Sequence, residues 1–284
     1  MSNLTPDAVV VSALSKHFGR NKNKRLALDR VSFKVQPGEM VALIGASGSG
    51  KSTLMRHIAG LVRGDGIGSI SVAGAIVQDS AGISRDIRRM RRRIGFIFQQ
   101  FNLVGRLSLL TNVLAGMIGN TSLWRTVLMH YPAADRQRAM LALARVKLAD
   151  YASQRASTLS GGQQQRAAIA RALVQGAAVI LGDEPIASLD PVSAAAVMDV
   201  LARINQEDGV TVLVSLHQVD YARRYCPRTI ALCRGVVVYD GPTVGLTHAL
   251  LKDIYGQEYG AVDTPSEVVQ PVAVRAPKPQ LQPV

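Results

Sequence analysis

The sequence has few of the residues that mark several common classes of protein. Its 284 residues include two cysteines, Cys226 and Cys233, which form no Cys-x-x-Cys pair and have no neighbouring His or Cys cluster. A disulfide framework is therefore excluded, and we expect two reduced, partly buried thiols. Aromatic residues make up 5% of the chain, which leaves few rings on which nucleic-acid bases could stack.

Long apolar runs are also absent. Hydrophobic residues make up 48% of the chain, yet no run approaches the roughly 18 residues that a membrane-spanning helix requires. The segment Met1–Asp7 lacks the basic-then-apolar pattern of a signal peptide. We therefore expect a cytoplasmic chain, long enough for one large domain or two lobes.

Acidic residues are in the minority. The chain has 33 Lys and Arg against 20 Asp and Glu, a net charge of +13. The basic residues are densest in two clusters: Arg85, Arg88, Arg89, Arg91, Arg92 and Arg93, and Lys16, Arg20, Lys22, Lys24 and Arg25. Nucleic acid, anionic lipid and an anionic ligand all suit such a surface. No nucleic-acid-binding motif is present, so we expect a solvated basic face near a nucleotide or a membrane, and no nucleic-acid partner.

One stretch fits the pattern Gly-x-x-x-x-Gly-Lys-[Ser/Thr] in full: Gly45, Ala46, Ser47, Gly48, Ser49, Gly50, Lys51, Ser52 and Thr53. Glycines let the backbone curl until its N–H groups face a phosphate. Lys51 supplies a cation for the β- and γ-phosphates, and Ser52 offers a hydroxyl to Mg²⁺. The start of a helix near Lys51 adds a positive dipole end. The stretch therefore predicts a nucleotide-phosphate site.

The flanks of this loop give it the expected context. Met40–Ile44 is a short apolar run typical of a buried parallel strand. The residues after the loop predict a helix, with Leu54, Ile58 and Leu61 on one face. A glycine loop between a strand and a helix is where a phosphate-binding loop has to lie.

Alternating and apolar segments predict further strands around the loop. Val9–Leu14 and Val31–Val35 indicate an antiparallel region ahead of it. Phe18 lies in that region, where its ring could stack on a purine or belong to a hairpin core. Further predicted strands are Ser69–Val72, Ala75–Val77, Ile94–Phe98, Ala178–Leu181 and Val210–Ser215, and Thr229–Leu232 with Val236–Tyr239 as a hairpin.

Helical patterns lie between these strands. Ile83–Met90 predicts a turn or two of helix that carries arginines. From about residue 102 to 157 the sequence predicts a helical insert, with helices at Asn112–Met117, Ser122–Met129 and Ala133–Val146. Ser160 suits the N-cap of a further helix that runs to about Val174.

The end of the chain differs in composition from the rest. Five of its 12 prolines follow Gly260. We expect residues 261–284 to form an extended, disordered tail.

Further motifs line up with the phosphate loop: Gln99 after a strand, Leu159-Ser160-Gly161-Gly162-Gln163, Asp183-Glu184, Ser188-Leu189-Asp190 and His217. In type, order and spacing they resemble the ATP-binding subunits of ABC transporters, over about residues 9–250. The resemblance implies an α/β fold: a P-loop, RecA-like ABC ATPase core with an antiparallel β region and an α-helical subdomain. Residues 1–260 would form one domain, with its core at 1–100 and 158–260 and the helical subdomain at about 101–157.

The segment from Phe98 to Gly116, the segment from Asp183 to Pro191 and the single tryptophan, Trp124, resemble the phosphonate-importer branch of that family. This implies ATP-driven uptake of phosphonate or a related phosphorus oxyanion. The alternative is a non-transport ABC ATPase that serves a soluble enzyme complex or nucleic acid. Co-purification with membranes or with a soluble complex would distinguish the two.

The resemblance also implies roles for single residues. ATP and Mg²⁺ would be the cofactors, with Glu184 as general base, His217 on the γ-phosphate and Gln99 reaching metal and water. Asp183, Ser52 and Gln99 would serve the metal. Phe18 would stack on the base, and Gly45 to Thr53 would hold the phosphates.

The remaining motif residues are expected to act on a second copy. Ser160, Gly161, Gly162 and Gln163 would cover the nucleotide of the partner, and Asp190 would lie near that seam. This implies a head-to-tail homodimer on the cytoplasmic face of the inner membrane. Its partners would be integral-membrane permease subunits and, indirectly, a periplasmic substrate-binding protein.

Overall fold

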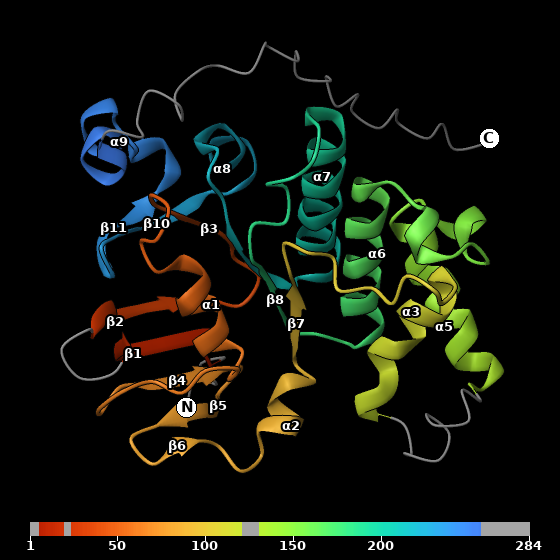
Figure 1. Ribbon diagram of the computed structural model, residues 1–284, viewed down its shortest axis with the longest axis horizontal. Helices are drawn as coiled ribbons and strands as arrows, with labels where there is room; N and C mark the ends of the chain where they lie inside the picture. The colour runs from red at the N-terminus through yellow and green to blue at the C-terminus, as the bar shows by residue number, and fades with distance from the viewer. Residues whose placement is uncertain (1–5, 20–23, 121–130, 257–284) are drawn as a thin grey trace, which may run out of the picture.

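The structure is a computed structural model that describes residues 6–19, 24–120 and 131–256 (Figure 1). Several predictions fall outside these residues. They are the helix Ser122–Met129, Trp124, the tail at 261–284, and Arg20 and Lys22 of the second basic cluster.

A six-stranded sheet forms the centre of the molecule, in the order β11-β10-β3-β9-β8-β7. Its strands are β3 (Met40–Ile44), β7 (Ile94–Ile97), β8 (Val179–Gly182), β9 (Thr211–Ser215), β10 (Arg228–Cys233) and β11 (Val236–Pro242). All neighbours pair in parallel except β10 and β11, which form the predicted antiparallel hairpin. Strands β3, β8 and β9 are buried along their whole length. Helices cover one face of the sheet, and a helix together with a second sheet covers the other.

A second, antiparallel sheet has the order β2-β1-β4-β5-β6. Its strands are β1 (Val9–Phe18), β2 (Arg25–Val35), β4 (Ser69–Val72), β5 (Ala75–Asp79) and β6 (Gly82–Ile83). Helix α1 (Lys51–Ile58) buries Leu54, Met55 and Ile58 in one hydrophobic cluster with residues of both sheets. The predicted antiparallel region is confirmed, and α1 joins it to the central sheet.

The other helices and 3-10 turns complete the chain. They are α2 (Ile87–Arg91), α3 (Leu109–Leu114), η2 (Ala115–Asn120), α5 (Ala133–Arg145), η3 (Ala149–Tyr151), η4 (Ala156–Thr158), α6 (Gly161–Val174), α7 (Pro191–Asp208), α8 (Val219–Tyr225), η5 (Thr243–Gly245) and α9 (His248–Tyr255). Within the described part of residues 101–157, every regular element is a helix or 3-10 turn. No helix in the described ranges is long and apolar enough to cross a membrane.

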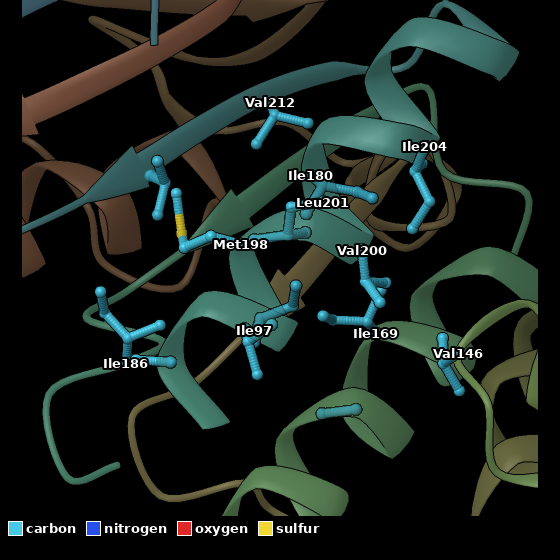
Figure 2. Close-up of a cluster of buried hydrophobic side chains, with 14 of the residues drawn as sticks. Ile97, Val146, Ile169, Ile180, Ile186, Met198, Val200, Leu201, Ile204 and Val212 are labelled. Atoms are coloured by element: carbon cyan, nitrogen blue, oxygen red, sulfur yellow. The ribbon is translucent and has the colours of Figure 1, made fainter. Parts of the chain in front are cut away.

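The largest core cluster joins the central sheet to the helices α6 and α7. Figure 2 shows Ile97, Ile180 and Val212, from three parallel strands, with Ile169 of α6 and Leu201 of α7. Full burial of a Leu or Ile side chain is worth about 1.5–3 kcal/mol. This cluster therefore fixes α6 firmly against the edge of the sheet that β7 and β8 form.

Helices α7, α8 and α9 were not predicted from the sequence. Helix α7 nevertheless carries clear signals: Asp190 caps it, Pro191 follows at the first position, and Gly209 ends it with φ +64°. Its buried face repeats at helical spacing from Ala194 to Ile204. A search for Asp-Pro at a helix start would have found it.

Several predicted boundaries were wrong. The helix predicted at Asn112–Met117 is α3 followed by η2, and the two strands of the antiparallel region are longer than predicted. Leu61 lies beyond α1 and is 43% exposed, because the chain turns at Gly60 with φ +64°. Ile83 belongs to strand β6, so the helix predicted from it begins only at Ile87. Phe98 lies outside β7, which ends at Ile97.

The two cysteines are unpaired, as predicted. Cys226 is buried, and burial raises the pKa of its thiol to about 12. It is therefore an uncharged core residue at neutral pH.

Candidate functional site

The phosphate loop joins β3 to α1 through glycines that no other residue could replace without strain. Gly45, Gly48 and Gly50 have φ values of +146°, +72° and +110°, a region that disfavours side chains. A Cβ on Gly45 would lie 2.2 Å from the carbonyl oxygen of Leu232, and one on Gly50 would lie 2.6 Å from that of Ala27. The loop is thus packed directly against the backbone of β10 and β2.

Lys51 lies at the start of α1 and is 4% exposed. Its Nζ donates to the carbonyl oxygens of Gly45, at 2.6 Å, and of Ala46, at 3.1 Å. The ammonium is therefore held beside the carbonyl groups at the start of the phosphate loop. Ser49 is equally buried, and its Oγ has no hydrogen-bond partner among the described residues. A cation and an unsatisfied hydroxyl suit an anionic ligand at this loop.

A cavity of about 310 Å³ opens beside the loop. Its lining consists of Phe18, Arg25, Ala27, Gly48, Ser49, Gly50, Lys51, Ser52, Thr53 and Glu184. Phe18 ends β1 and is 45% exposed, with Nζ of Lys16 at 5.5 Å from its ring centre. The ring is thus a half-open wall of the cavity and not part of a hairpin core.

The acidic pair follows β8, at the carboxyl edge of the central sheet. The Ser215 hydroxyl, at the end of β9, donates to Oδ1 of Asp183 at 3.3 Å and accepts from the backbone N–H of Glu184 at 2.9 Å. Glu184 has φ +50°, a conformation that costs a non-glycine residue about 1 kcal/mol or more. The turn aims Glu184 into the cavity that Lys51 also lines.

His217 follows β9 and contacts Glu184. Its Nε2 donates to Oε1 of Glu184 at 2.6 Å. This hydrogen bond, with the charges of His217 and Lys51, lowers the pKa of the Glu184 carboxyl despite partial burial. Glu184 is therefore ionised at neutral pH and can accept a proton.

The pKa of Asp183 is shifted in the opposite direction to that of Glu184. Burial raises the pKa of its carboxyl, while hydrogen bonds from Ser52 and Ser215 and the charge of Arg56 oppose the rise. The side chain is 5% exposed. A desolvated carboxylate beside the Ser52 hydroxyl forms a set of hard oxygen donors, which suits a small divalent cation.

Gln99 is placed elsewhere. It is exposed just beyond β7 and lines a different depression, of about 530 Å³, together with Asn102, Gln164 and Ser188. It is not among the residues that line the phosphate cavity.

Residues Ser160 to Gln163 begin α6. The Ser160 Oγ accepts from the Gln163 N–H at 3.3 Å, and Oε1 of Gln163 accepts from the Ser160 N–H at 2.8 Å. This reciprocal capping box confirms the predicted N-cap and fixes the helix start. None of these four residues lines the phosphate cavity of their own chain.

Asp190 caps α7 beside this helix start. Its Oδ1 accepts from the Ser193 N–H at 2.9 Å, and the hydrogen bonds from Ser193 lower the pKa of its exposed carboxyl. A Cβ on Gly162 would lie 2.7 Å from the Ser193 Oγ. Two helix N-termini therefore lie close together. A Cβ on the half-buried Gly161 would lie 3.2 Å from Cδ2 of Leu189 and 3.3 Å from Cζ of Phe101.

Two side chains near the site were missed from the sequence. Arg25 lines the phosphate cavity, with Nη2 at 3.3 Å from where a Cβ on Gly48 would lie. It begins β2 and belongs to the second basic cluster, so charge density was a usable signal. Ser215 connects Asp183 and Glu184; no sequence pattern marked it.

Comparisons with known proteins agree with this geometry. A protein-family model described as ABC transporter matches residues 28–187. The chain is 60% identical over 252 residues to the phosphonates import ATP-binding protein PhnC 1 of Cupriavidus metallidurans, covering 88% of each chain. It is 56% identical over 274 residues to PhnC 2 of Cupriavidus necator, covering 95% of each.

Solved structures show the same fold. The dimeric structure of MJ0796, a bacterial ABC transporter cassette, aligns with a TM-score of 0.73 at 32% identity and covers 84% of this chain and 100% of that one. A dimeric post-hydrolysis state of the same cassette, bound to ADP and Pi, gives a TM-score of 0.72 at 33% identity, with the same coverage.

Proposed function

This chain belongs to the ABC transporter family of ATP-binding proteins, and we propose that it is the ATP-hydrolysing subunit of an importer of phosphonate or a related phosphorus oxyanion. The observation that supports ATP hydrolysis is the meeting of Lys51 and Glu184 in one cavity, with Asp183 and His217 behind them. The substrate class is supported by 56–60% identity to relatives named as phosphonate import proteins.

Most of the residues that line the cavity have a chemical role in this function. Phe18 stacks on the adenine, the N–H groups of residues 45–53 face the phosphates, and Lys51 neutralises their charge. Glu184, kept ionised, takes the proton from the attacking water. His217 orients Glu184 through their 2.6 Å hydrogen bond and faces the γ-phosphate.

The donor set fits Mg²⁺. Asp183 is a buried carboxylate with a raised pKa next to the Ser52 hydroxyl, so a cation would relieve its desolvation. These two residues would hold Mg²⁺, which would offset the negative charge of the ATP phosphates. Gln99 is a further candidate that would have to move toward the cavity from its own depression.

The functional unit is a homodimer. None of Ser160, Gly161, Gly162, Gln163 and Asp190 lines the phosphate cavity of their own chain. Ser160 and Asp190 are exposed, Gly161 and Gln163 are half-buried and Gly162 is buried; in the dimer this group of residues covers the nucleotide of the second copy. ATP bridges the two half-sites, and its hydrolysis lets them separate. ATP drives closure because it binds the closed dimer more tightly than the open one.

Transport requires further chains. Residues 1–100 and 158–260 form the ATPase core, and residues 101–157 form a helical subdomain that follows dimer closure. Integral-membrane permease subunits contact the depression that Gln99 lines, at the cytoplasmic face of the inner membrane. A periplasmic substrate-binding protein delivers the oxyanion to the permease.

Growth on a single phosphorus source tests this function. A strain that lacks the gene should grow on a phosphonate only when it carries the wild-type protein, and not the Lys51→Ala form. Growth on phosphate should be the same for both, which controls for general damage. Restoration by both forms would refute the need for ATP binding. Normal growth of the deletion strain on the phosphonate would refute the substrate class.

A further inference from the structure

The backbone that follows β7 adopts an unusual conformation. Phe101 and Asn102 have φ values of +21° and +50°, and two consecutive non-glycine residues in this region are unfavourable unless their surroundings hold them. This segment follows directly on Gln99 and Gln100. The contacts that hold it therefore decide where Gln99 can reach.

Arg171 of α6 supplies one of these contacts. Its Nη1 donates to the carbonyl oxygen of Asn102 at 2.6 Å, the length of a strong charge-assisted bond. Burial lowers the pKa of the guanidinium, yet an arginine keeps its charge in a protein. No carboxylate pairs with Arg171 in the ranges that the structure describes. Among the described residues, the hydrogen bond of the Arg171 side chain goes to this loop.

Gln165, which precedes Arg171 on the same helix, holds the other end of the segment. It is fully buried, and its Nε2 donates to the carbonyl oxygen of Phe98 at 3.4 Å. Helix α6 thus contacts the chain on both sides of Gln99 and Gln100. Because both donors lie on one helix, α6 holds the segment at two points.

The helical insert prevents Arg171 from moving independently. A Cβ on Gly116 of η2 would lie 2.4 Å from the carbonyl oxygen of Arg171 and 3.0 Å from its Cγ. Because Gly116 has no side chain, η2 can pack directly against the backbone and the Cγ atom of Arg171. The arginine lies between the insert on one side and the Gln99 segment on the other.

The same helix begins with Ser160 to Gln163, the edge proposed to cover the partner's nucleotide. We propose that Arg171 is a positioning residue that makes the Gln99 segment and the start of α6 move as one body during ATP hydrolysis. This inference rests on the proposed ATPase function. Arg171 touches no nucleotide; it sets the place of Gln99 through the carbonyl of Asn102.

Steady-state ATPase kinetics on the full-length protein test the inference, with Arg171→Ala compared with Arg166→Ala. Arg166 lies on the same helix and is half-buried, and burial lowers its pKa too; its Nη1 donates to the carbonyl oxygen of Val146 at 2.8 Å. Both variants lose one arginine–carbonyl bond. Only Arg171→Ala releases the Gln99 segment, so only this variant should lower kcat. We expect a decrease of about tenfold, because one lost hydrogen bond that positions a reacting group costs about that factor in rate.

Two further readouts separate positioning from general destabilisation. ATP affinity, measured with a fluorescent ATP analogue in a Glu184→Gln background, should stay within about twofold, because Lys51 and Phe18 are untouched. Arg171→Lys should recover part of kcat, since an ammonium can still donate to the Asn102 carbonyl.

Equal kcat values for Arg171→Ala and Arg166→Ala, with equal losses of Tm, would overturn the inference. So would a loss of kcat in Arg171→Ala that is matched by an equal loss of ATP affinity. A wild-type protein without ATPase activity would refute the proposed function, and the inference with it.

Discussion

The phosphate loop and the start of α6 are both helix N-termini with glycines, yet they are built differently. At the loop, Lys51 and Ser49 are buried and a cavity of about 310 Å³ adjoins them. At α6, Ser160 and Gln163 cap each other's backbone and leave the helix start at an exposed edge. The phosphate loop keeps the unsatisfied Ser49 hydroxyl for a ligand, whereas the start of α6 uses its Ser160 and Gln163 side chains to cap its own backbone.

This difference explains why one chain holds only half of each proposed site. A loop with an inward-facing cation binds phosphate on its own. A capped, exposed helix edge contributes contacts only when another surface meets it. The closeness of Asp190 and Ser193 to Gly162 makes that edge rigid, as a surface shared by two copies requires.

Glu184→Gln should cause the largest change in activity, because Glu184 lies in the cavity beside the phosphate loop. Removing the proton acceptor should lower kcat by about 10²–10⁴-fold while ATP binding is retained. Because the γ-phosphate then persists, ATP should hold the protein as a dimer in size-exclusion chromatography. Glu207→Gln changes an exposed carboxylate and should leave both properties unaltered. If Glu184→Gln has the kcat of the wild type, Glu184 is not the general base.

Lys51→Ala should lower ATP affinity by about 100-fold. The lost contact is a hydrogen bond between charged groups, worth about 3 kcal/mol. Titration with a fluorescent ATP analogue measures this directly. Lys34→Ala, which removes an ammonium that is 67% exposed, serves as the control. An affinity change of less than threefold in Lys51→Ala would mean that the loop does not bind the phosphates through this cation.

A comparison of Ser160→Ala with Ser108→Ala tests whether the start of α6 has a role beyond capping its own helix. Each serine caps a helix by accepting from a backbone N–H, that of Gln163 at 3.3 Å or that of Thr111 at 3.2 Å. Each substitution should cost about 1 kcal/mol of stability. Only Ser160→Ala should also weaken ATP-dependent dimerisation, by about tenfold for one lost contact to the partner's nucleotide.

Analytical ultracentrifugation with ATP in the Glu184→Gln background distinguishes these outcomes. Equal dimerisation of the two serine variants would show that the α6 terminus does not meet a second copy.

Asp183→Asn should have the smallest effect, a rise in Tm. The pKa of Asp183 is raised by burial, so the folded state disfavours the carboxylate. Stability is therefore lost as pH rises through this raised pKa and is regained as pH falls below it. Without Mg²⁺, the variant should melt about 2–4 °C above the wild type near pH 7, for roughly 1 kcal/mol.

The Tm advantage of Asp183→Asn should shrink as the pH falls toward the ordinary pKa of an aspartate. Asp150→Asn, at an exposed carboxyl, should show no such trend in calorimetry. A constant difference across the pH range would contradict the assigned cause.

Short-range features of this protein follow from its sequence alone. The glycine loop, its preceding strand and the Ser160 cap were predicted correctly, because neighbouring residues decide backbone conformation and helix capping. Helix α7 could have been found in the same way from Asp190 and Pro191. The end of α1 could also have been found, because Gly60, with φ +64°, is the kind of glycine that ends a helix, and it places Leu61 outside α1.

Contacts between distant segments were decided by tertiary structure. His217 meets Glu184 across 33 residues, and Arg171 meets Asn102 across 69. Such pairs depend on the strand order β9-β8-β7 and on the packing of α6 against it. Residue types showed which groups could do chemistry. The sheet order decided which of them lie together, because a strand's own residues do not specify its neighbour and burial of the shared core does.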